Sequence, residues 1–435
     1  MTAFRFLTAG ESHGPALGAT LEGLPAGVPV TADAIASDLH RRQGGYGRGA
    51  RQVIEQDRAE ILAGIRHGLT IGSPILLLIR NRDWENWTRV MQVEPLTPDQ
   101  SNELARLAAE GDRRAQPVTR LRPGHADLAG ALKYGFTDVR PVLERASARE
   151  TAARVAAGAV CRAFLAALGI EVWSFTAEVG GVAVDPANAT RSRAESAASP
   201  LRCPDPAAEA RMVARIDEAR SLGNTVGGVF EVVAHGLPIG LGSHVHWDRR
   251  LDGALAAAVM SIQSVKGVEL GLGFAQTRLF GSEVHDVIGG RDADGAWIHR
   301  SNNAGGLTGG ITNGQPLVVR GAVKPISTLA RPLPSADLVS GEAVEKAHYE
   351  RSDISVVPAA GVIGEAMVLL VLTSAVLEKF GGDSLAEVRD NLARYVARIG
   401  GDPGASDGVG PARAPSSAAG SGAAGSGAAG SGGDD

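Results

Sequence analysis

The sequence predicts one folded body that mixes helices and strands, followed by a simple tail. The chain has 435 residues, of which 44% are hydrophobic, so a sizeable core can form. Apolar residues alternate between residues 53 and 79, as in strands, and recur at helical spacing between residues 147 and 168. From about Pro403 the chain is mainly Gly, Ala, Ser and Pro, which cannot bury a core. We therefore expect a single domain over residues 1–402 and a disordered tail over residues 403–435.

The elements follow from these patterns. Strands are expected at the apolar start, Phe4–Leu7, and through residues 53–79. Two further strands end in the related segments G-L-P-A-G, before a helix near Ala32, and G-L-P-I-G, before a helix near Asp248. This echo suggests two related halves. Helices are expected where apolar residues keep a helical period, over residues 127–136, 147–168, 206–222, 249–265, 361–380 and 384–399.

Composition and charge exclude several classes of protein. The net charge of −5 argues against a general nucleic-acid binder. The longest apolar stretch, around residues 362–377, contains Glu365 and falls short of the ~18 apolar residues expected of a membrane span. The N-terminal residues lack the pattern of a signal peptide. Two cysteines make no disulfide framework, and Cys161 falls in a helical pattern typical of a core. We expect a cytoplasmic protein.

Two glycine-rich segments near the N-terminus carry the strongest chemical signal. G-E-S-H-G at residues 10–14 places Ser12 and His13 in a glycine-flanked turn, and R-R-Q-G-G-Y-G-R-G at residues 41–49 contains Arg42 and Arg48. Glycines let a backbone approach a ligand closely, and arginine forks suit phosphate. A histidine can move a proton near neutral pH, although a lone histidine is also often structural. Together the segments predict a phosphate-bearing substrate beside a proton-transferring histidine.

The middle of the chain adds two basic motifs. In R-L-R-P-G-H-A-D, residues 120–127, His125 precedes a helix, where it either caps that helix or joins the nearby arginines at an anionic ligand. In E-R-A-S-A-R-E-T, residues 144–151, Ser147 and Glu150 form a capping-box pattern at the start of a long helix. Free backbone N–H groups at a helix start can also bind phosphate. Capping does not explain why Arg145 and Arg149 bracket the serine.

Three later segments contain further polar groups. His244 and His246 resemble a metal pair, but no second cluster of ligands accompanies them, so no metal is predicted. The glycine-rich loop at residues 302–314 and the following K-P-I-S-T, residues 324–328, could hold a phosphate or the edge of a flavin ring. No G-x-G-x-x-G lies between a strand and a helix, so a Rossmann domain is not expected. Asp353, in R-S-D, is either a helix N-cap or a proton acceptor.

This ordered set of motifs resembles the chorismate synthase family. The family's three signature segments are matched by G-E-S-H-G, E-R-A-S-A-R-E-T and R-S-D-I-S-V-V-P. Four further segments also match: R-R-Q-G-G-Y-G-R-G, R-P-G-H-A-D, A-A-A-V-M-S-I-Q-S-V-K-G-V-E and K-P-I-S-T. The resemblance runs from Phe4 to about Gly401 and leaves out the tail. Any one motif is modestly specific, whereas seven in order are highly specific.

The resemblance implies a lyase of the shikimate pathway of aromatic amino-acid biosynthesis. The reaction is a trans-1,4-elimination of phosphate from 5-enolpyruvylshikimate-3-phosphate to give chorismate, with reduced FMN and no net redox change. By this resemblance, His13 protonates the leaving phosphate, His125 protonates the reduced flavin and Asp353 relays a proton. Ser12, Arg42 and Arg48 contact substrate or NADP. The flavin site is formed by Arg145, Ala146, Ser147, Gln263, Ser264, Gly309, Lys324, Pro325, Ile326, Ser327, Thr328 and Arg351.

The resemblance also implies the architecture and the partners. The family fold is an α+β sandwich of antiparallel sheets with helices and internal pseudo-two-fold symmetry, and it forms homotetramers. The chain shows no added reductase domain, so we expect a monofunctional bacterial-type enzyme. Such an enzyme takes reduced flavin from an external flavin reductase, with NADPH as an indirect reductant.

Two other function classes are compatible with single motifs. An RNA-binding module could use residues 41–49 as an RGG-like segment, but the acidic net charge and 4% aromatic content oppose it. A flavin-dependent oxidoreductase would also bind FMN. It would differ in consuming NADPH in proportion to its product.

Overall fold

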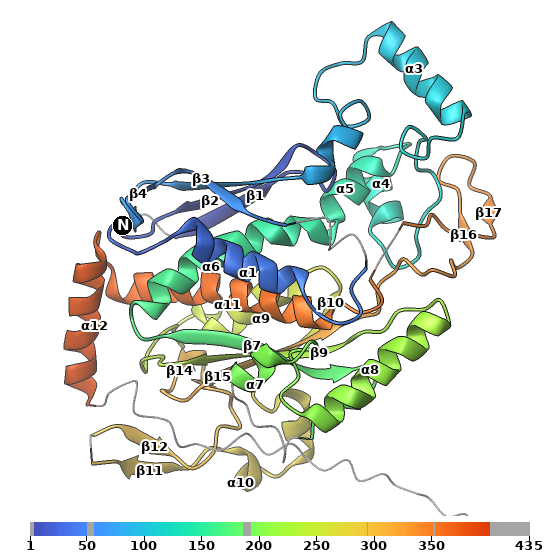
Figure 1. Ribbon diagram of the computed structural model, residues 1–435. Helices are drawn as coiled ribbons and strands as arrows, with labels where there is room; N and C mark the ends of the chain where they lie inside the picture. Colours follow the sequence, from blue (N-terminus) through green and yellow to red (C-terminus); the bar gives the residue numbers. More distant parts are fainter. Residues whose placement is uncertain (1–3, 50–55, 186–192, 294, 351–352, 401–435) are drawn as a thin grey trace, which may run out of the picture.

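A computed structural model describes residues 4–49, 56–185, 193–293, 295–350 and 353–400. The fold is a sandwich of two antiparallel sheets with helices between them (Figure 1). The first sheet has the strand order β1-β2-β6-β3, and its register pairs Leu7 with Thr20 and Thr20 with Leu76. Its strands are β1 (Arg5–Ala9), β2 (Ala16–Glu22), β6 (Ile75–Arg80) and β3 (Ala59–Ala63).

The second sheet has the strand order β10-β15-β9-β7-β8, and all of its pairings are antiparallel. Alternate residues of β15 and β9 face the helices because strand side chains alternate between the two faces of a sheet. Its strands are β10 (Val265–Leu270), β15 (Leu317–Val323), β9 (Gly228–His235), β7 (Glu171–Val179) and β8 (Val182–Ala183).

Four helices fill the space between the sheets. Two of them, α1 (Ala32–Gln43) and α6 (Thr151–Ala166), lie under the first sheet, and α11 (Val357–Phe380) packs on β7 and β9 of the second. The fourth, α9 (Leu251–Met260), packs against α11. Where α6 meets α11, a Cβ on Gly158 would lie 2.5 Å from the Cβ of Ala366, so only glycine allows this close contact.

The central helix α11 is the one helix in the described residues that is long and apolar enough to cross a membrane. In its most apolar 18-residue window, 83% of the residues are buried inside the molecule. Core helices of soluble proteins pass the same length and composition test. The helix therefore reads as the centre of the hydrophobic core, and the buried Glu365 within it is paired with arginines.

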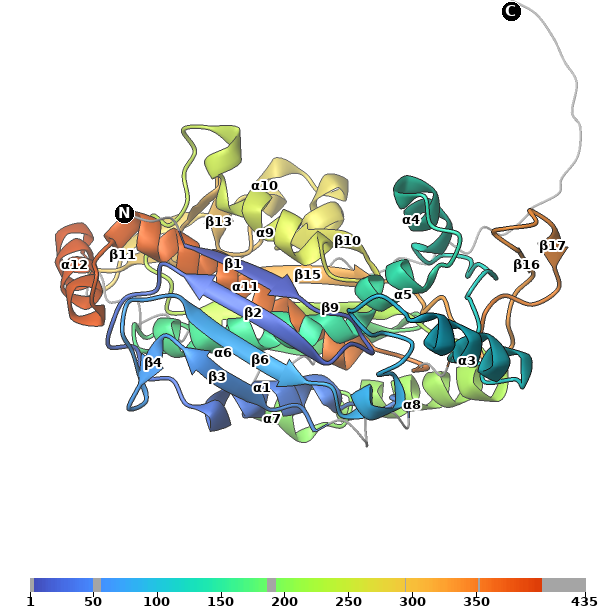
Figure 2. The same cartoon turned by 90° about the horizontal axis from the view of Figure 1, so that it is seen from above.

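Smaller elements surround the sandwich. At one end, α3, α4, α5 and the β16–β17 hairpin gather, and α12 lies at the opposite end (Figures 1 and 2). Bounds of the peripheral helices are α3 (Pro98–Ala109), α4 (Asp127–Tyr134), α5 (Arg140–Ala146), α7 (Arg193–Ala198), α8 (Pro206–Ser221), α10 (Gly281–Val284) and α12 (Leu385–Ile399). The short strands are β4 (Ile65–Arg66), β5 (Leu69–Thr70), β11 (Ile288–Arg291), β12 (Trp297–His299), β13 (Leu307–Thr308), β14 (Ile311–Thr312), β16 (Ser335–Ala336) and β17 (Ala343–Val344).

Most expected elements are confirmed, including the α+β class, and two details are wrong. The helix expected over residues 249–265 ends at Met260, because the Ser261 hydroxyl bonds the carbonyl of Ala258 and competes with the helix. Ser264 then adopts a left-handed backbone, φ 69°, before β10 begins. The expected capping box at Ser147 does not form either. Ser147 separates α5 from α6, and its Oγ accepts from the N–H of Arg149 instead.

The echoed G-L-P segments follow β2 and β9, one strand from each sheet, and precede α1 and α9. This agrees with the expected pseudo-symmetry. Both cysteines lie in the described part of the chain and are buried and unpaired. Burial raises the pKa of the Cys161 thiol to about 12, as expected for a core residue. Residues 401–435, where the tail is predicted, lie outside the described residues.

Candidate active site

A cavity of about 720 Å³ opens at the end of the sandwich beside α4 and α5. Segments far apart in the sequence meet around it: the turn after β1, the end of α1 and the loop after it, the α5–α6 junction and the start of α11. Its predicted residues are Ser12, His13, Arg42, Arg48, His125, Ala146, Ser147, Gln263, Ser264, Lys324, Ile326, Ser327, Thr328 and Asp353. The fold therefore brings together both predicted histidines, both predicted substrate arginines and the predicted acid.

His13 lies in the tight turn between β1 and β2. The turn needs glycine at Gly10, where φ is 106° and a Cβ would lie 2.4 Å from the carbonyl oxygen of Ala16. The His13 Nδ1 lies 2.8 Å from Oε1 of the buried Glu144. The ring also stacks on Trp87, with 4.0 Å between ring centroids. Glu144 thus fixes one edge of the ring and Trp87 covers one face, while His13 still borders the cavity.

His125 is held in a similar way in front of α4. Its Nδ1 lies 2.5 Å from Oδ1 of Asp127, and the Nε of Arg122 donates to the other carboxylate oxygen at 2.9 Å. Burial would raise the pKa of Asp127, but hydrogen bonds from His125 and Arg122 outweigh it and hold that pKa well below its usual range. Asp127 therefore stays ionised and orients both side chains. The N-cap position of α4 is taken by Ala126 and not by His125.

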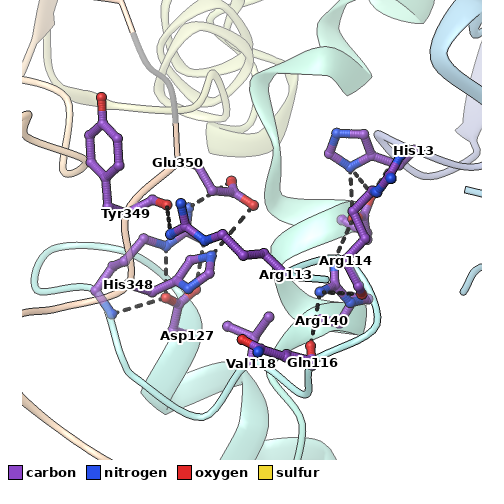
Figure 3. Close-up of polar contacts among 12 residues, drawn as sticks. His13, Arg113, Arg114, Gln116, Val118, Asp127, Arg140, His348, Tyr349 and Glu350 are labelled. Carbon is purple, nitrogen blue, oxygen red and sulfur yellow. Dashed lines mark hydrogen bonds and ion pairs between the residues drawn. The ribbon is translucent and has the colours of Figure 1, made fainter. Parts of the chain in front are cut away.

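Glu350 borders the cavity close to this group. His348 Nε2 lies 3.7 Å from its carboxylate (Figure 3). Arg122 Nη1 lies 3.5 Å from the same carboxylate. Burial raises the pKa of Glu350, yet the hydrogen bond from His348 and the charges of Arg122, His348 and His13 together lower it. The cavity wall therefore carries an ionised carboxylate between its basic groups.

Two buried arginines share one carboxylate at the base of the cavity. Asp57 accepts from Arg42 Nη2 at 2.9 Å and from Arg149 Nη1 at 2.6 Å. Burial and the charges of Arg149 and Arg48 lower the pKa of Arg42, whereas the charge of Asp57 raises it. The lowering effects are larger and bring this pKa to about 10. The Nε of Arg42 is buried without a hydrogen-bond partner among the described residues. This Nε can still donate to a ligand that enters the cavity.

Arg48 pairs with the predicted acid. Its Nη1 lies 3.4 Å from Oδ2 of Asp353, whose Oδ1 accepts from the N–H of Gly49 at 2.5 Å. Burial lowers the pKa of Arg48 although Asp353 raises it. Its Nε, like that of Arg42, is buried with no partner in the part of the chain that the structure describes. Asp353 is therefore bound to the arginine loop and does not cap α11, which begins after Val356.

Two of the predicted flavin segments, residues 263–264 and 324–328, lie side by side at the second sheet. The N–H of Lys324 donates to the carbonyl of Ser264 at 2.9 Å, so the turn before β10 meets the loop after β15. Lys324 Nζ donates to the carbonyl of Gly124, which links this loop to the His125 turn. Burial and the charge of Lys266 lower the pKa of Lys324. Gln263 donates to Glu150, while its Oε1 is buried without a partner among the described residues.

Three of the predicted flavin residues that the structure describes, Arg145, Pro325 and Gly309, are not on the cavity wall. Arg145 donates to the carbonyls of Gly10 and Thr8, and Pro325 lies between two lining residues. Gly309 lies in the β13–β14 turn, where a Cβ would meet nothing within 4 Å. Arg351 lies outside the described residues. Their roles remain predictions.

Several groups of the site were not predicted as site residues. They are charged or aromatic side chains that hold the predicted ones, namely Trp87, Asp57, Arg122, Asp127, Glu144, Arg149 and Glu350. Arg122, Asp127, Glu144 and Arg149 lie within the quoted motifs, but a motif does not show which side chains meet. Trp87, Asp57 and Glu350 lie outside those motifs.

The histidine pair near α9 has another arrangement. His246 Nδ1 lies 2.6 Å from Asp248 Oδ1, and both side chains are exposed. Within the described residues, no group of three or more His, Cys, Asp or Glu could hold a metal ion.

Comparisons with known proteins give one family. The chorismate synthase family model matches residues 4–377. Proteins named chorismate synthase from Solibacter usitatus and Symbiobacterium thermophilum are 55% and 56% identical, each covering 91% of this chain and 99% of its own length. A crystal structure of chorismate synthase superposes with a TM-score of 0.71 at 42% identity, over 92% of this chain and 99% of the other. The chain therefore belongs to the chorismate synthase family of carbon–oxygen lyases.

Proposed function

We propose that this chain eliminates phosphate in a trans-1,4 sense from 5-enolpyruvylshikimate-3-phosphate and so forms chorismate. Family membership supports the reaction, and the cavity carries the proposal for this chain. Arg42, Arg48, Arg122, Arg149 and Lys324 all border one cavity of about 720 Å³. The substrate carries a phosphate and two carboxylates, and arginines bind such anions through charge-assisted hydrogen bonds.

The buried nitrogen atoms support this use of the cavity. The Nε groups of Arg42 and Arg48 have no hydrogen-bond partner among the described residues, and an unpaired buried donor costs free energy. An anionic substrate would supply the missing acceptors. The same burial opposes the RNA-binding alternative, because these arginines pair with Asp57 and Asp353 in the interior and are not displayed as a surface segment.

The described residues also fit a reduced FMN cofactor. The unpaired Gln263 Oε1, the Ser327 and Thr328 hydroxyls and the ammonium of Lys324 border the same cavity and could hold the ring and phosphate of the flavin. Reduced FMN, when bound, supplies electron density to the substrate as phosphate leaves. The proposed binding set remains Arg145, Ala146, Ser147, Gln263, Ser264, Gly309, Lys324, Pro325, Ile326, Ser327, Thr328 and Arg351.

Three residues are proposed to move protons. His13, with Nδ1 turned to Glu144, presents Nε2 to the leaving phosphate and donates a proton there. His125, with Nδ1 turned to Asp127, holds a proton beside the proposed flavin segments. Asp353 accepts a proton at a carboxylate oxygen, next to Arg48.

The test is phosphate release from 5-enolpyruvylshikimate-3-phosphate under anaerobic conditions. We expect stoichiometric phosphate and chorismate with dithionite-reduced FMN, and none with oxidised FMN. NADPH consumption in proportion to chorismate would instead support a flavin-dependent oxidoreductase. Absence of phosphate release with reduced FMN would contradict the proposal.

The remaining family properties are also proposed for this chain. They are a cytoplasmic location, a homotetramer, NADPH as an indirect reductant and a separate source of reduced flavin. The outer face of the first sheet supports assembly, because Leu7 and Leu76 are exposed there although they sit on paired strands. Light scattering on the full chain would test the tetramer.

A further inference from the structure

We propose that Glu144 is a positioning residue that fixes His13 in the tautomer with its proton on Nδ1. Nε2 then faces the cavity, where it takes up a second proton and, from the doubly protonated ring, donates it to the leaving phosphate while the Nδ1 proton stays on Glu144's side. The inference rests on the proposed role of His13 as a proton donor. It adds Glu144 as the residue that orients the His13 ring. The carboxylate is completely removed from solvent, with its side chain 0% exposed, so its position is determined by its partners.

Both oxygens of one carboxylate contact His13, and Oε2 also lies 3.1 Å from Nδ1. Glu144 Oε1 lies 2.8 Å from Nδ1 of the ring, and Oε2 accepts from the backbone N–H of His13 at 2.7 Å. The backbone N–H of Ser12 also donates to the carbonyl of Glu144 at 3.1 Å. The turn that carries His13 is therefore tied to the end of α5 by four contacts. A carboxylate is acceptor-only when ionised, so the ring nitrogen facing it must be a donor.

A second layer holds the carboxylate and the ring. Arg140 Nη1 lies 3.8 Å from Glu144 Oε1, and Arg140 Nη2 donates to the carbonyls of Arg114 and Gln116 at 3.2 and 3.3 Å (Figure 3). The guanidinium of Arg140 also lies 5.2 Å from the ring centroid of Trp87, which stacks on His13. The ring thus has little freedom to flip. Second-layer groups of this kind orient a reactive side chain and fix its tautomer.

A glutamine at position 144 would have the same shape and the opposite effect. The backbone N–H of His13 can only donate, so the side-chain carbonyl of the glutamine must face it. The amide NH₂ would then take the place of Oε1, 2.8 Å from Nδ1, and favour an acceptor at that nitrogen over the longer 3.1 Å contact with the carbonyl oxygen. The neutral ring would carry its proton on Nε2, and the doubly protonated ring would meet a donor. His13 would thereby lose its function as a proton donor while keeping its place.

The kinetic experiment compares Glu144→Gln, His13→Ala and the double variant in the anaerobic assay. We expect Glu144→Gln to lower kcat by at least ~10²-fold with KM changed only a few-fold, since a general acid contributes ~10²–10⁴-fold. The double variant should be no slower than His13→Ala, because Glu144 acts through His13. Glu231→Gln is the matched control. Glu231 is equally buried, pairs with Arg320 at 2.7 Å on the second sheet and does not border the cavity, so kcat should stay within a few-fold.

A second readout is independent of turnover. In protein labelled with ¹⁵N-histidine, the His13 signals are identified by their loss in His13→Ala. At alkaline pH, where the ring is neutral, wild type should show a proton on Nδ1, and Glu144→Gln should show it on Nε2. A wild-type ring protonated on Nε2 would overturn the inference even if the variant failed to fold. Wild-type kcat in Glu144→Gln would also overturn it. Wild-type kcat in His13→Ala would instead reject the proposed role of His13, whatever the tautomer.

Discussion

Arg48 and Asp353 face each other across the edge of the cavity, with 3.4 Å between Nη1 and Oδ2. They come from motifs about three hundred residues apart, and Gly49, the neighbour of Arg48, donates its N–H to the same carboxylate. The pairing leaves the Nε of Arg48 buried without a partner in the described residues. Asp353 therefore holds Arg48 at Nη1, and the Nε of Arg48 can still donate to a ligand.

This geometry predicts that Arg48→Lys impairs substrate binding although the charge is kept. Lysine offers a point charge on a flexible stem and lacks the fork that can contact Asp353 and a ligand together. Loss of one hydrogen bond to a charged group costs about 1.5–3 kcal/mol, which is roughly ten-fold or more in affinity. The measurement is the KM for substrate beside the Kd for FMN without substrate. An unchanged KM with a large loss of FMN affinity would place Arg48 at the flavin.

His13→Ala should keep the fold and FMN binding and lose most of the turnover. The side chain touches Glu144 and Trp87 at the cavity wall, and general acids contribute ~10²–10⁴-fold to rate. Single-turnover phosphate release measures the loss, and the melting temperature and FMN titration report the fold. Turnover within a few-fold of wild type would contradict the assignment.

The sequence predicted the local features of this site and missed its long-range supports. Flanking glycines predict the turn at His13, and Pro123, Gly124 and the apolar spacing that follows predict the helix after His125. Glu144 lies inside a recognised motif, but nothing local shows that its carboxylate meets a histidine 131 residues away. Trp87 reaches His13 from a segment without any motif. The end of α9 was misplaced because serine hydroxyl competition and the left-handed Ser264 stopped a helix that composition alone would extend.

Removal of residues 404–435 should leave activity and thermal stability nearly unchanged. Their composition cannot bury a core, and family matches account for residues 4–377 without them. Melting curves and the anaerobic phosphate assay on the shortened chain test this. A melting temperature lower by many degrees, or loss of the proposed tetramer, would show that the tail docks on the body.

A buried ion cluster away from the cavity wall gives a prediction for stability. Glu365, fully buried in α11, accepts from Arg41 and Arg162 at 2.6 Å each and from Arg202 at 3.3 Å, and Asp38 binds the first two arginines as well. Burial raises the pKa of Glu365, but the charges of Arg162, Arg41 and Arg202 outweigh it and bring the pKa down to about 2. The ionised carboxylate is thus favoured by folding.

Glu365→Gln should therefore lower the free energy of unfolding at neutral pH by roughly 3–5 kcal/mol, because it leaves buried arginines undercompensated. A carboxyl group whose pKa is lower in the folded state stabilises the fold above its ordinary pKa of 4.5, and that stabilisation is lost as the pH falls toward about 2. The difference between variant and wild type should accordingly shrink through this pH window in urea unfolding. Glu60→Gln is the control, since the exposed Glu60–Arg80 pair should contribute less than about 1 kcal/mol. Equal effects of the two substitutions at pH 7 would show that burial of the Glu365 cluster adds nothing to stability.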